Sequence, residues 1–210
     1  MLLLGTVAVM LHLASISSAQ PNQGCRTHCG GIEIPYPFGI GFGCAIKQGF
    51  EISCNRTADG IERPFIGRTE LLNISVSSGQ SRILMRIPSY CYNSTSEQMN
   101  SYIWGFDLIW PYRFSDVRNK FTSIGCNTLA YIYKTEGLER DATGCASVCG
   151  SPKDLKNGSC AGVGCCQNAV PKGLTRYKVY FYNVDYVKVA NTWPFNKCSY
   201  AGLVETEAFT

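Results

Sequence analysis

The sequence predicts a mostly β fold: a small, disulfide-rich secreted glycoprotein with many short antiparallel strands in two cross-linked lobes. Three observations lead to this fold class. The chain begins with a short apolar segment, it holds twelve cysteines from Cys25 onward, and its clearest patterns alternate apolar and polar residues. An even number of cysteines in an exported chain indicates disulfide bonds formed in an oxidising compartment.

Residues 1–19 have the character of a secretory signal peptide. Residues 2–13 are largely apolar but form too short a run to span a bilayer, and Ser17 and Ala19 supply small residues at the cleavage positions. No Lys or Arg precedes the apolar run, which departs from the usual pattern. We therefore expect a secreted chain that begins near Gln20.

Four Asn-x-Ser/Thr sequons support the assignment to an exported glycoprotein. They lie at Asn55, Asn73, Asn93 and Asn157, and none contains proline. Because N-glycans are bulky and hydrophilic, each of these positions is expected at the surface.

The segment from Cys25 to Cys44 is predicted to form a stiff, extended arch. Pro35 and Pro37 fix their own φ angles and cannot donate to a sheet ladder, so the segment belongs at an edge rather than in a central strand. Three glycines between residues 39 and 43 permit turns that are closed to other residues. The cysteines on both sides are expected to pin the arch to its domain.

Strict alternation predicts a β-hairpin made of residues 72–77 and 81–87. Its inward-facing side chains are expected to be Leu72, Ile74, Val76, Ile83, Met85 and Ile87. Arg82 and Arg86 then share the outer face with Asn73. A glycan on Asn73 would stand near both arginines, which weakens them as a binding pair.

Beyond Glu136 the composition changes. Cysteine, glycine, serine and proline become frequent, and five cysteines lie between residues 145 and 166. Such a segment buries too little apolar surface to fold without cross-links. We therefore expect a β domain over residues 20–136 and a cysteine-rich region over residues 137–210, which also contains strands near residues 177–182 and 200–204.

All cysteines are expected to form disulfide bonds: Cys25, Cys29, Cys44, Cys54, Cys91, Cys126, Cys145, Cys149, Cys160, Cys165, Cys166 and Cys198. Six pairs allow roughly ten thousand connectivities, so the pairing is left open. The adjacent Cys165 and Cys166 are expected to bond to two separate partners. Zinc binding is the rival interpretation, and it is disfavoured because export brings oxidation.

Several motifs together resemble the ectodomain of plant wall-associated receptor kinases. They are Cys25-x3-Cys29-Gly30-Gly31, Ile34-Pro35-Tyr36-Pro37-Phe38-Gly39-Ile40, Phe50-Glu51-Ile52-Ser53-Cys54, Asn119-Lys120-Phe121-x-x-Ile124-Gly125-Cys126-Asn127 and Cys160-Ala161-Gly162-Val163-Gly164-Cys165-Cys166-Gln167. The resemblance implies a galacturonan-binding domain over residues 20–136 and a wall-associated-kinase-like region over residues 137–210. The sequence shows no epidermal-growth-factor cysteine spacing, no transmembrane run after the leader and no protein-kinase signature.

The charged residues are compatible with weak, salt-sensitive attraction to an acidic ligand. The formal net charge is +4. The chain contains no run of five or more basic residues, so a nucleic-acid or polybasic membrane role has little support. Polygalacturonate carries one carboxylate per sugar, and Arg can bind a carboxylate bidentately. Arg56, Arg63 and Arg68 follow the recognised motif in a polar stretch and form the preferred cluster, with a solvated loop as the alternative. The other basic residues considered are Lys47, Arg113, Arg118 and Lys120.

Aromatic side chains form a second candidate set, because their flat faces suit the C–H faces of sugars, and Tyr and Trp keep a polar edge. Tyr36 and Phe38 on the arch are the candidates from the recognised motif. Further aromatic residues considered are Phe42, Trp104, Trp110, Tyr112 and Trp193. The alternative is that these rings fill the core.

Catalytic and metal-binding roles have little support. His28 is the one histidine expected after leader removal, and no Gly-x-Ser-x-Gly motif or zinc-ligand cluster occurs. A glycosidase-like carboxylate pair stays open, because its members meet only in three dimensions. Calcium can bridge pectate to protein carboxylates, but no Asp-rich loop has calcium-ligand spacing. We therefore expect no catalytic residue, no metal and no cofactor.

The resemblance implies an extracellular module that recognises pectin (polygalacturonic acid) in the plant cell wall, or at the outer face of the plasma membrane as part of a longer receptor, and the positive charge and the aromatic residues are compatible with this ligand. The alternative is a receptor-ectodomain portion that binds a peptide or protein ligand, and a polysaccharide-cleaving enzyme is a third hypothesis. No nucleic-acid partner and no membrane span are expected in this chain. The oligomeric state is left open.

Overall fold

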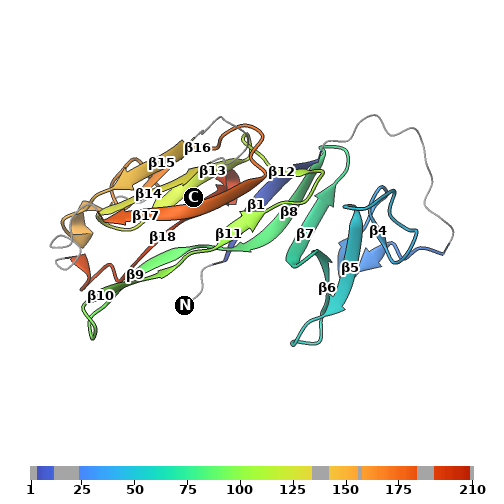
Figure 1. Cartoon of the computed structure of the whole chain (residues 1–210), viewed down its shortest axis with the longest axis horizontal. Helices are drawn as coiled ribbons and strands as arrows, with labels where there is room; N and C mark the ends of the chain where they lie inside the picture. Colours follow the sequence, from blue (N-terminus) through green and yellow to red (C-terminus); the bar gives the residue numbers. More distant parts are fainter. Residues whose placement is uncertain (1–3, 12–23, 134–141, 156–157, 184–191, 209–210) are drawn as a thin grey trace. The chain divides into compact units, whose positions relative to one another are not determined.

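The computed structural model describes residues 4–11, 24–133, 142–155, 158–183 and 192–208 (Figure 1). Strands make up nearly all of its regular structure, with two three-residue 3-10 helices, η1 (Pro152–Asp154) and η2 (Thr206–Ala208). The predicted mostly β fold is therefore confirmed. The chain divides into two compact units, which we call the arch unit (Thr6–Met85 with Ile109–Phe114) and the two-sheet unit (mainly Arg86–Leu108 with Ser115–Thr210).

The arch unit is built on a seven-stranded sheet of order β12-β1-β8-β7-β6-β5-β4. Its strands are β1 (Leu4–Leu11), β4 (Gly39–Ile40), β5 (Glu51–Arg56), β6 (Glu62–Ile66), β7 (Thr69–Ser75), β8 (Gln80–Arg86) and β12 (Tyr112–Phe114). A separate two-stranded ladder joins β2 (His28–Cys29) to β3 (Ile32–Glu33). Because β4 is the last strand in this order, next to β5, the arch lies at the sheet edge, as its prolines predict.

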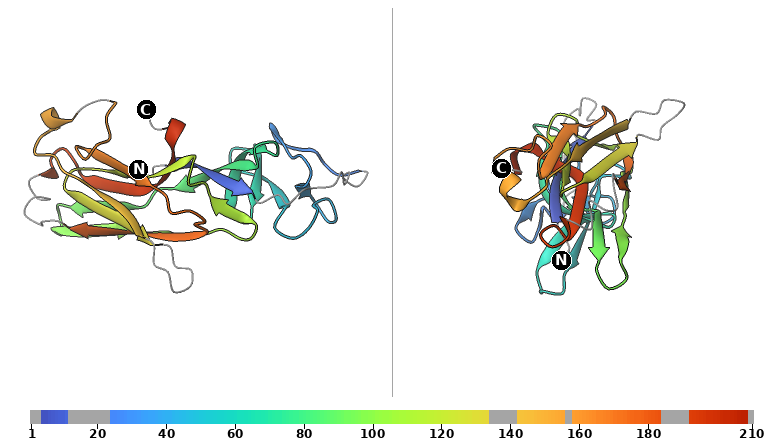
Figure 2. Two further views of the ribbon diagram at one scale, coloured as in Figure 1. Left: turned by 90° about the horizontal axis from the view of Figure 1, so that it is seen from above. Right: turned by 90° about the vertical axis from the view of Figure 1, so that its left-hand side faces the viewer.

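The two-sheet unit contains a five-stranded sheet and a four-stranded sheet. The first has the order β10 (Gln98–Tyr102), β9 (Ser89–Asn93), β18 (Cys198–Glu205), β13 (Asn119–Ile124) and β16 (Cys165–Ala169). The second has the order β11 (Gly105–Asp107), β17 (Arg176–Asn183), β14 (Thr128–Tyr133) and β15 (Ala142–Ser147). The two sheets lie face to face (Figure 2), and Tyr90 of β9 stacks on Phe181 of β17 with ring centroids 5.5 Å apart.

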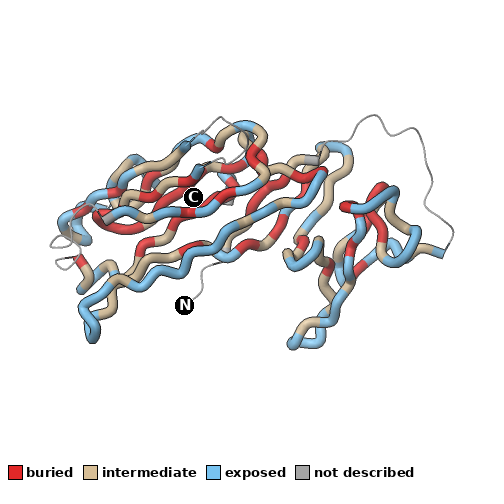
Figure 3. The backbone as a smooth tube through the Cα atoms, in the orientation of Figure 1, coloured by how far each residue is buried: buried red, intermediate tan, exposed pale blue. Residues whose placement is uncertain are grey.

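The core of the two-sheet unit comes from the inner faces of these sheets. Buried and exposed residues alternate along the strands (Figure 3), as expected for sheets with one face in a core. Phe121, Ile132, Val179 and Leu203 are all essentially inaccessible to solvent. Apolar burial of this kind is the main favourable term that holds the two sheets together.

The two units divide the chain differently from the boundary expected near Glu136. Strands β13 and β14 precede that position, yet they pair with β16 and β18 and with β15 and β17, which follow it. A fall in apolar content along the chain indicates where a segment needs disulfide bonds in order to fold. Membership of a unit depends instead on pairing between strands that are distant in sequence.

The predicted hairpin forms from β7 and β8, with corrections to its inner face: Val76 and Ile87 lie outside the two strands and, like Ile74, are only half-buried. Leu71 pairs with Ile83, and a β-bulge lies between Leu71 and Asn73. Leu71 is buried, whereas Leu72 is only half-buried, so Leu71 takes the inward place that the alternation assigned to Leu72. The extra residue at the bulge shifts the alternation by one. Asn73 still pairs with Arg82 on the outer face, as expected.

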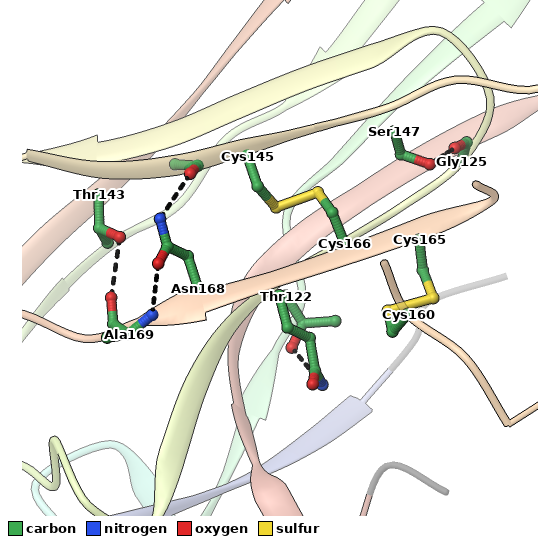
Figure 4. The surroundings of a disulfide bond; sticks show 12 residues. Thr122, Gly125, Thr143, Cys145, Ser147, Cys160, Cys165, Cys166, Asn168 and Ala169 are labelled. Carbon is green, nitrogen blue, oxygen red and sulfur yellow. Dashed lines mark hydrogen bonds between the residues drawn. A yellow bond between two sulfur atoms is a disulfide. The ribbon is translucent and has the colours of Figure 1, made fainter. Parts of the chain in front are cut away.

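All twelve cysteines form disulfide bonds, and none is free. The pairs are Cys25–Cys44, Cys29–Cys54, Cys91–Cys198, Cys126–Cys149, Cys145–Cys166 and Cys160–Cys165. The first two lie in the arch unit and the other four in the two-sheet unit, so each lobe carries its own cross-links. The prediction that Cys165 and Cys166 bond to separate partners is confirmed (Figure 4).

The Cys145–Cys166 bond joins β15 of one sheet to β16 of the other (Figure 4). Two hydrogen bonds reinforce the same junction. The Thr143 hydroxyl donates to the Ala169 carbonyl at 2.8 Å, and the Asn168 side-chain amide donates to the Gly144 carbonyl at 3.1 Å. The cysteine-rich segment therefore cross-links the two sheets along one side.

The amino-terminal segment contributes β1 to the arch unit, between β12 and β8. Val7 and Val9 are buried there, and Val9 pairs with Phe114. Residues 12–19 lie outside the described part of the chain. The assignment of residues 1–19 as a cleaved signal peptide stays a prediction.

Candidate functional site

The arch is held by covalent bonds and short turns. The Cys25–Cys44 and Cys29–Cys54 disulfides anchor its two flanks. The Phe38 amide donates to the Pro35 carbonyl at 3.0 Å, across a turn that contains a cis Tyr36–Pro37 bond. The Ile46 amide donates to the Pro37 carbonyl at 3.0 Å, which closes the next part of the arch. The segment is thus a fixed scaffold rather than an open loop.

Phe38 lies in the core beneath this arch, which corrects its place among the binding candidates. Its side chain is 2% exposed and packs on Phe50, with ring centroids 5.4 Å apart. Phe50 in turn contacts Tyr112. A ring that is closed to solvent cannot stack on a sugar, so the core alternative holds for Phe38. Tyr36 remains half-buried on the arch.

Tyr112 connects the arch to a segment far along the chain. Its hydroxyl donates to the Gly49 carbonyl at 2.7 Å, and burial raises the pKa of Tyr112 above its ordinary value. Gly49 has a φ of +95°, and a Cβ there would lie 2.5 Å from the Trp110 carbonyl oxygen. Only glycine allows the Trp110–Pro111 backbone to come this close. The Gly49 segment, which follows the arch, therefore positions Trp110.

Trp110 and Lys47 form an exposed pair that we call the Trp110 platform. The Trp110 side chain is 65% exposed, and the Lys47 ammonium lies 4.4 Å from its ring centroid. A cation at this distance from an indole face is attracted by the ring quadrupole, which favours the ammonium staying next to the ring. The platform offers a flat apolar surface with a positive charge beside it.

The preferred basic cluster does not come together on one face. In the ladder between β5 and β6, Arg63 pairs with Asn55 and Arg56 pairs with Glu62. Because successive strand residues point to opposite faces, Arg56 and Arg63 project to opposite sides of the sheet. Arg68 lies exposed in the turn between β6 and β7. The expectation of a three-arginine cluster is therefore not met.

Arg63 is also engaged by acidic residues within the protein. It forms ion pairs with Asp59 and, at 3.2 Å, with Glu70. The Thr57 hydroxyl, with smaller contributions that include Arg63, lowers the pKa of Asp59. A neighbouring pair joins Arg26 to Glu62, and this hydrogen bond lowers the pKa of Glu62. These carboxylates neutralise much of the positive charge that the sequence suggested for this region.

The sequons occupy defined positions. Asn55 and Asn73 are both exposed, and their partners Arg63 and Arg82 place them on the outer face of the arch-unit sheet. Asn93 is half-buried, and its side-chain oxygen accepts hydrogen bonds from the Thr95 and Ser96 amides. Asn157 lies outside the described residues. N-glycosylation at the four sites stays a prediction, and glycans at the first two would cover this outer face.

The structure brings together residues that the sequence placed in separate candidate sets. Lys47 belonged to the basic set and Trp110 to the aromatic set, and no local pattern joins them. Among the described residues, no group of three or more His, Cys, Asp or Glu side chains is arranged to hold a metal ion. His28 is exposed, with its ring Nδ1 3.0 Å from the Thr27 hydroxyl.

The structure defines a disulfide-cross-linked β module with an exposed aromatic and cationic surface. Comparison with known proteins names the family: residues 25–85 match the model of the wall-associated receptor kinase galacturonan-binding domain. The chain belongs to the ectodomain family of plant wall-associated receptor kinases, which confirms the resemblance seen in its motifs. The matched model describes a binding domain rather than a catalytic one.

Three relatives from Arabidopsis thaliana define the extent of the similarity. Wall-associated receptor kinase 2 is 36% identical over 97% of this chain and 27% of its own length. Wall-associated receptor kinase 5 is 33% identical over 97% of this chain and 27% of its own length. Wall-associated receptor kinase 3 is 34% identical over 90% of this chain and 26% of its own length.

The chain thus spans about a quarter of the length of these relatives. No solved structure matches it. None of the helices in the described residues has the length and apolar character needed to cross a membrane.

Proposed function

We propose that the chain is an extracellular, cell-wall module that binds de-esterified pectin, polygalacturonic acid, through the Trp110 platform. The observation that carries the proposal is the exposed indole with the Lys47 ammonium at its face. A galacturonate ring that stacks its C–H face on the free part of the indole would bring its carboxylate within reach of Lys47. The family match of the neighbouring residues 25–85 supports the same class of ligand.

The small free energies expected for these contacts indicate that such a site acts on a polymer. An exposed cation paired with a carboxylate contributes about 0–1 kcal/mol, and an aromatic contact adds about 1 kcal/mol. One sugar at one platform therefore binds weakly. A chain with a carboxylate on every sugar can rebind along its length, which raises the effective affinity without new contacts.

The proposal is tested by retention of the secreted chain on immobilised polygalacturonate and on its methyl ester across a salt series. We expect retention on polygalacturonate that weakens as salt rises, because screening acts strongly on exposed charges, and much weaker retention on the ester. Equal retention on both polymers would contradict recognition of the carboxylates. Failure to bind either polymer would favour the alternative of a peptide or protein ligand, and release of reducing ends would favour an enzyme.

Changing Arg56, Arg63 and Arg68 together to Gln is expected to reduce retention on polygalacturonate by only about threefold or less. The reason is that Arg56 and Arg63 point to opposite faces and that Arg63 is already ion-paired, while exposed charges contribute little each. The measurement is the midpoint of elution in a salt gradient. A loss greater than tenfold would restore the arginine cluster as the binding site.

A further inference from the structure

The outer face of the four-stranded sheet carries a second group of aromatic and basic side chains. Along β17 the exposed residues Arg176, Lys178, Tyr180 and Tyr182 alternate with the buried Tyr177 and Val179. The alternation places the first four on one face of the sheet. This face belongs entirely to the two-sheet unit and lies outside the residues that match the galacturonan-binding family model.

Strand β14 adds two more tyrosines to the same face. Tyr131 pairs with Tyr180, and the two rings stack with centroids 5.5 Å apart and an interplanar angle of 13°. Tyr133 meets both rings edge-on, at 5.2 Å from Tyr131 and 5.8 Å from Tyr180. We call Tyr131, Tyr133, Tyr180 and Tyr182 the tyrosine face. Three mutually packed rings restrict one another's rotamers, so the surface is largely ordered before a ligand arrives.

A pocket of about 450 Å³ opens at the edge of the tyrosine face. It is lined by Gly105, Asp107, Tyr133, Arg176, Lys178 and Tyr180, among others. Gly105 pairs with Lys178 across β11 and β17, and its missing side chain leaves room beside the tyrosines. The volume lies within the range of small-ligand sites.

The chemistry of this surface suits a sugar acid. The Lys178 ammonium lies 5.6 Å from the Tyr180 ring centroid and supplies the positive charge for a sugar carboxylate, whereas Asp107 neutralises Arg176 through a 2.7 Å ion pair. Tyr180 is 37% exposed and Tyr182 is 62% exposed, so both rings offer accessible faces, and their hydroxyls supply polar edges. Protein-binding patches are instead depleted of lysine at their centres. Desolvation and, to a smaller extent, the neighbouring tyrosines raise the pKa of Tyr131 above its ordinary value.

We propose that the tyrosine face, with Lys178 and the adjoining pocket, is a second binding surface for an acidic oligosaccharide. The proposal rests on the proposed function for its ligand class but uses none of the same residues. Two such surfaces on one chain would let the protein engage a pectate polymer at two places, which increases retention beyond the affinity of either surface.

The test is titration of the full secreted chain with trigalacturonate, a ligand too short to exploit the length of the polymer, followed by NMR chemical shifts, because these detect weak binding and report each surface separately. We expect two binding sites in the unchanged protein. The double variant Tyr180→Ala/Tyr182→Ala is expected to lose one of them, with at least a roughly tenfold weaker constant at that site. Lys178→Gln is expected to weaken the same site for trigalacturonate but not for its methyl ester.

Tyr102→Ala is the matched control, because Tyr102 is an exposed tyrosine of the same unit on β10 of the other sheet. It is expected to keep both sites. If the double variant unfolds, Tyr182→Ala alone replaces it, because that side chain is the most exposed of the four.

The two proposals fail separately. Loss of a site in the tyrosine variants, with no effect of Trp110→Ala, would support the tyrosine face and reject the Trp110 platform. Unchanged two-site binding in the tyrosine and Lys178 variants would overturn the tyrosine face. A single site that Trp110→Ala abolishes would also overturn it, and a protein partner would then be the occupant to test.

Discussion

Replacing Trp110 by alanine is expected to weaken binding to polygalacturonate by about fivefold, because the exposed indole supplies the stacking surface of the platform. Lys47→Gln is expected to produce a different change. It should reduce both the salt dependence of binding and the discrimination against the methyl ester, because Lys47 is the charge beside the indole. The measurement is affinity electrophoresis or calorimetry with polygalacturonate at two ionic strengths.

The structure provides a matched control for this experiment. Trp104 is 41% exposed in the two-sheet unit, and the Arg86 guanidinium lies 5.4 Å from its ring centroid. Trp104→Ala therefore removes an exposed tryptophan with a cation beside it, but outside the arch unit. We expect nearly unchanged binding. Equal losses in the two tryptophan variants, or none in Trp110→Ala, would reject the platform as the pectate site.

Changing Phe38 to alanine is expected to destabilise the protein by about 3–5 kcal/mol, since the variant leaves a cavity under the arch where Phe50 packs. The measurement is denaturant unfolding under non-reducing conditions, followed by intrinsic fluorescence. Binding at temperatures where the variant is still folded should change little if the ring has only a structural role.

Phe42→Ala is the control for this change, because Phe42 is the same residue type on the same arch but fully exposed. Surface substitutions of this kind usually alter the free energy of unfolding by about 0.5 kcal/mol or less. If Phe38→Ala were as stable as Phe42→Ala while losing pectate affinity, Phe38 would return to the binding candidates and the core assignment would be wrong.

Local patterns identified much of the architecture. The alternation in residues 72–87 predicts the β7–β8 hairpin, and Pro35 and Pro37 place the arch at an edge, because both signals depend on neighbouring residues alone. The family resemblance rested on short motifs with cysteines at fitting distances, which the comparisons confirm. A single bulge after Leu71 was enough to change the inner face of β7, since its extra residue leaves no mark in the alternation.

The candidate site depended on contacts that local patterns do not report. Arg56, Arg63 and Arg68 are near in sequence but are separated by the two faces of the sheet and by the carboxylates that pair with Arg63. Lys47 and Trp110 are distant in sequence yet adjacent in space, because Gly49 has no side chain and lets the Trp110 backbone come close. The tyrosine face likewise requires β14 and β17 to pair in one register.

By itself, the sequence determined that this chain is a disulfide-bonded, mostly β member of the wall-associated receptor kinase ectodomain family, because composition and cysteine number are counted along the chain and short motifs depend on neighbouring residues alone. Only the tertiary structure decided which cysteines pair, which aromatic rings are buried and which cations stand beside exposed rings. The physical reason is that strand register and long-range packing set the direction of every side chain, and both are determined by the whole fold.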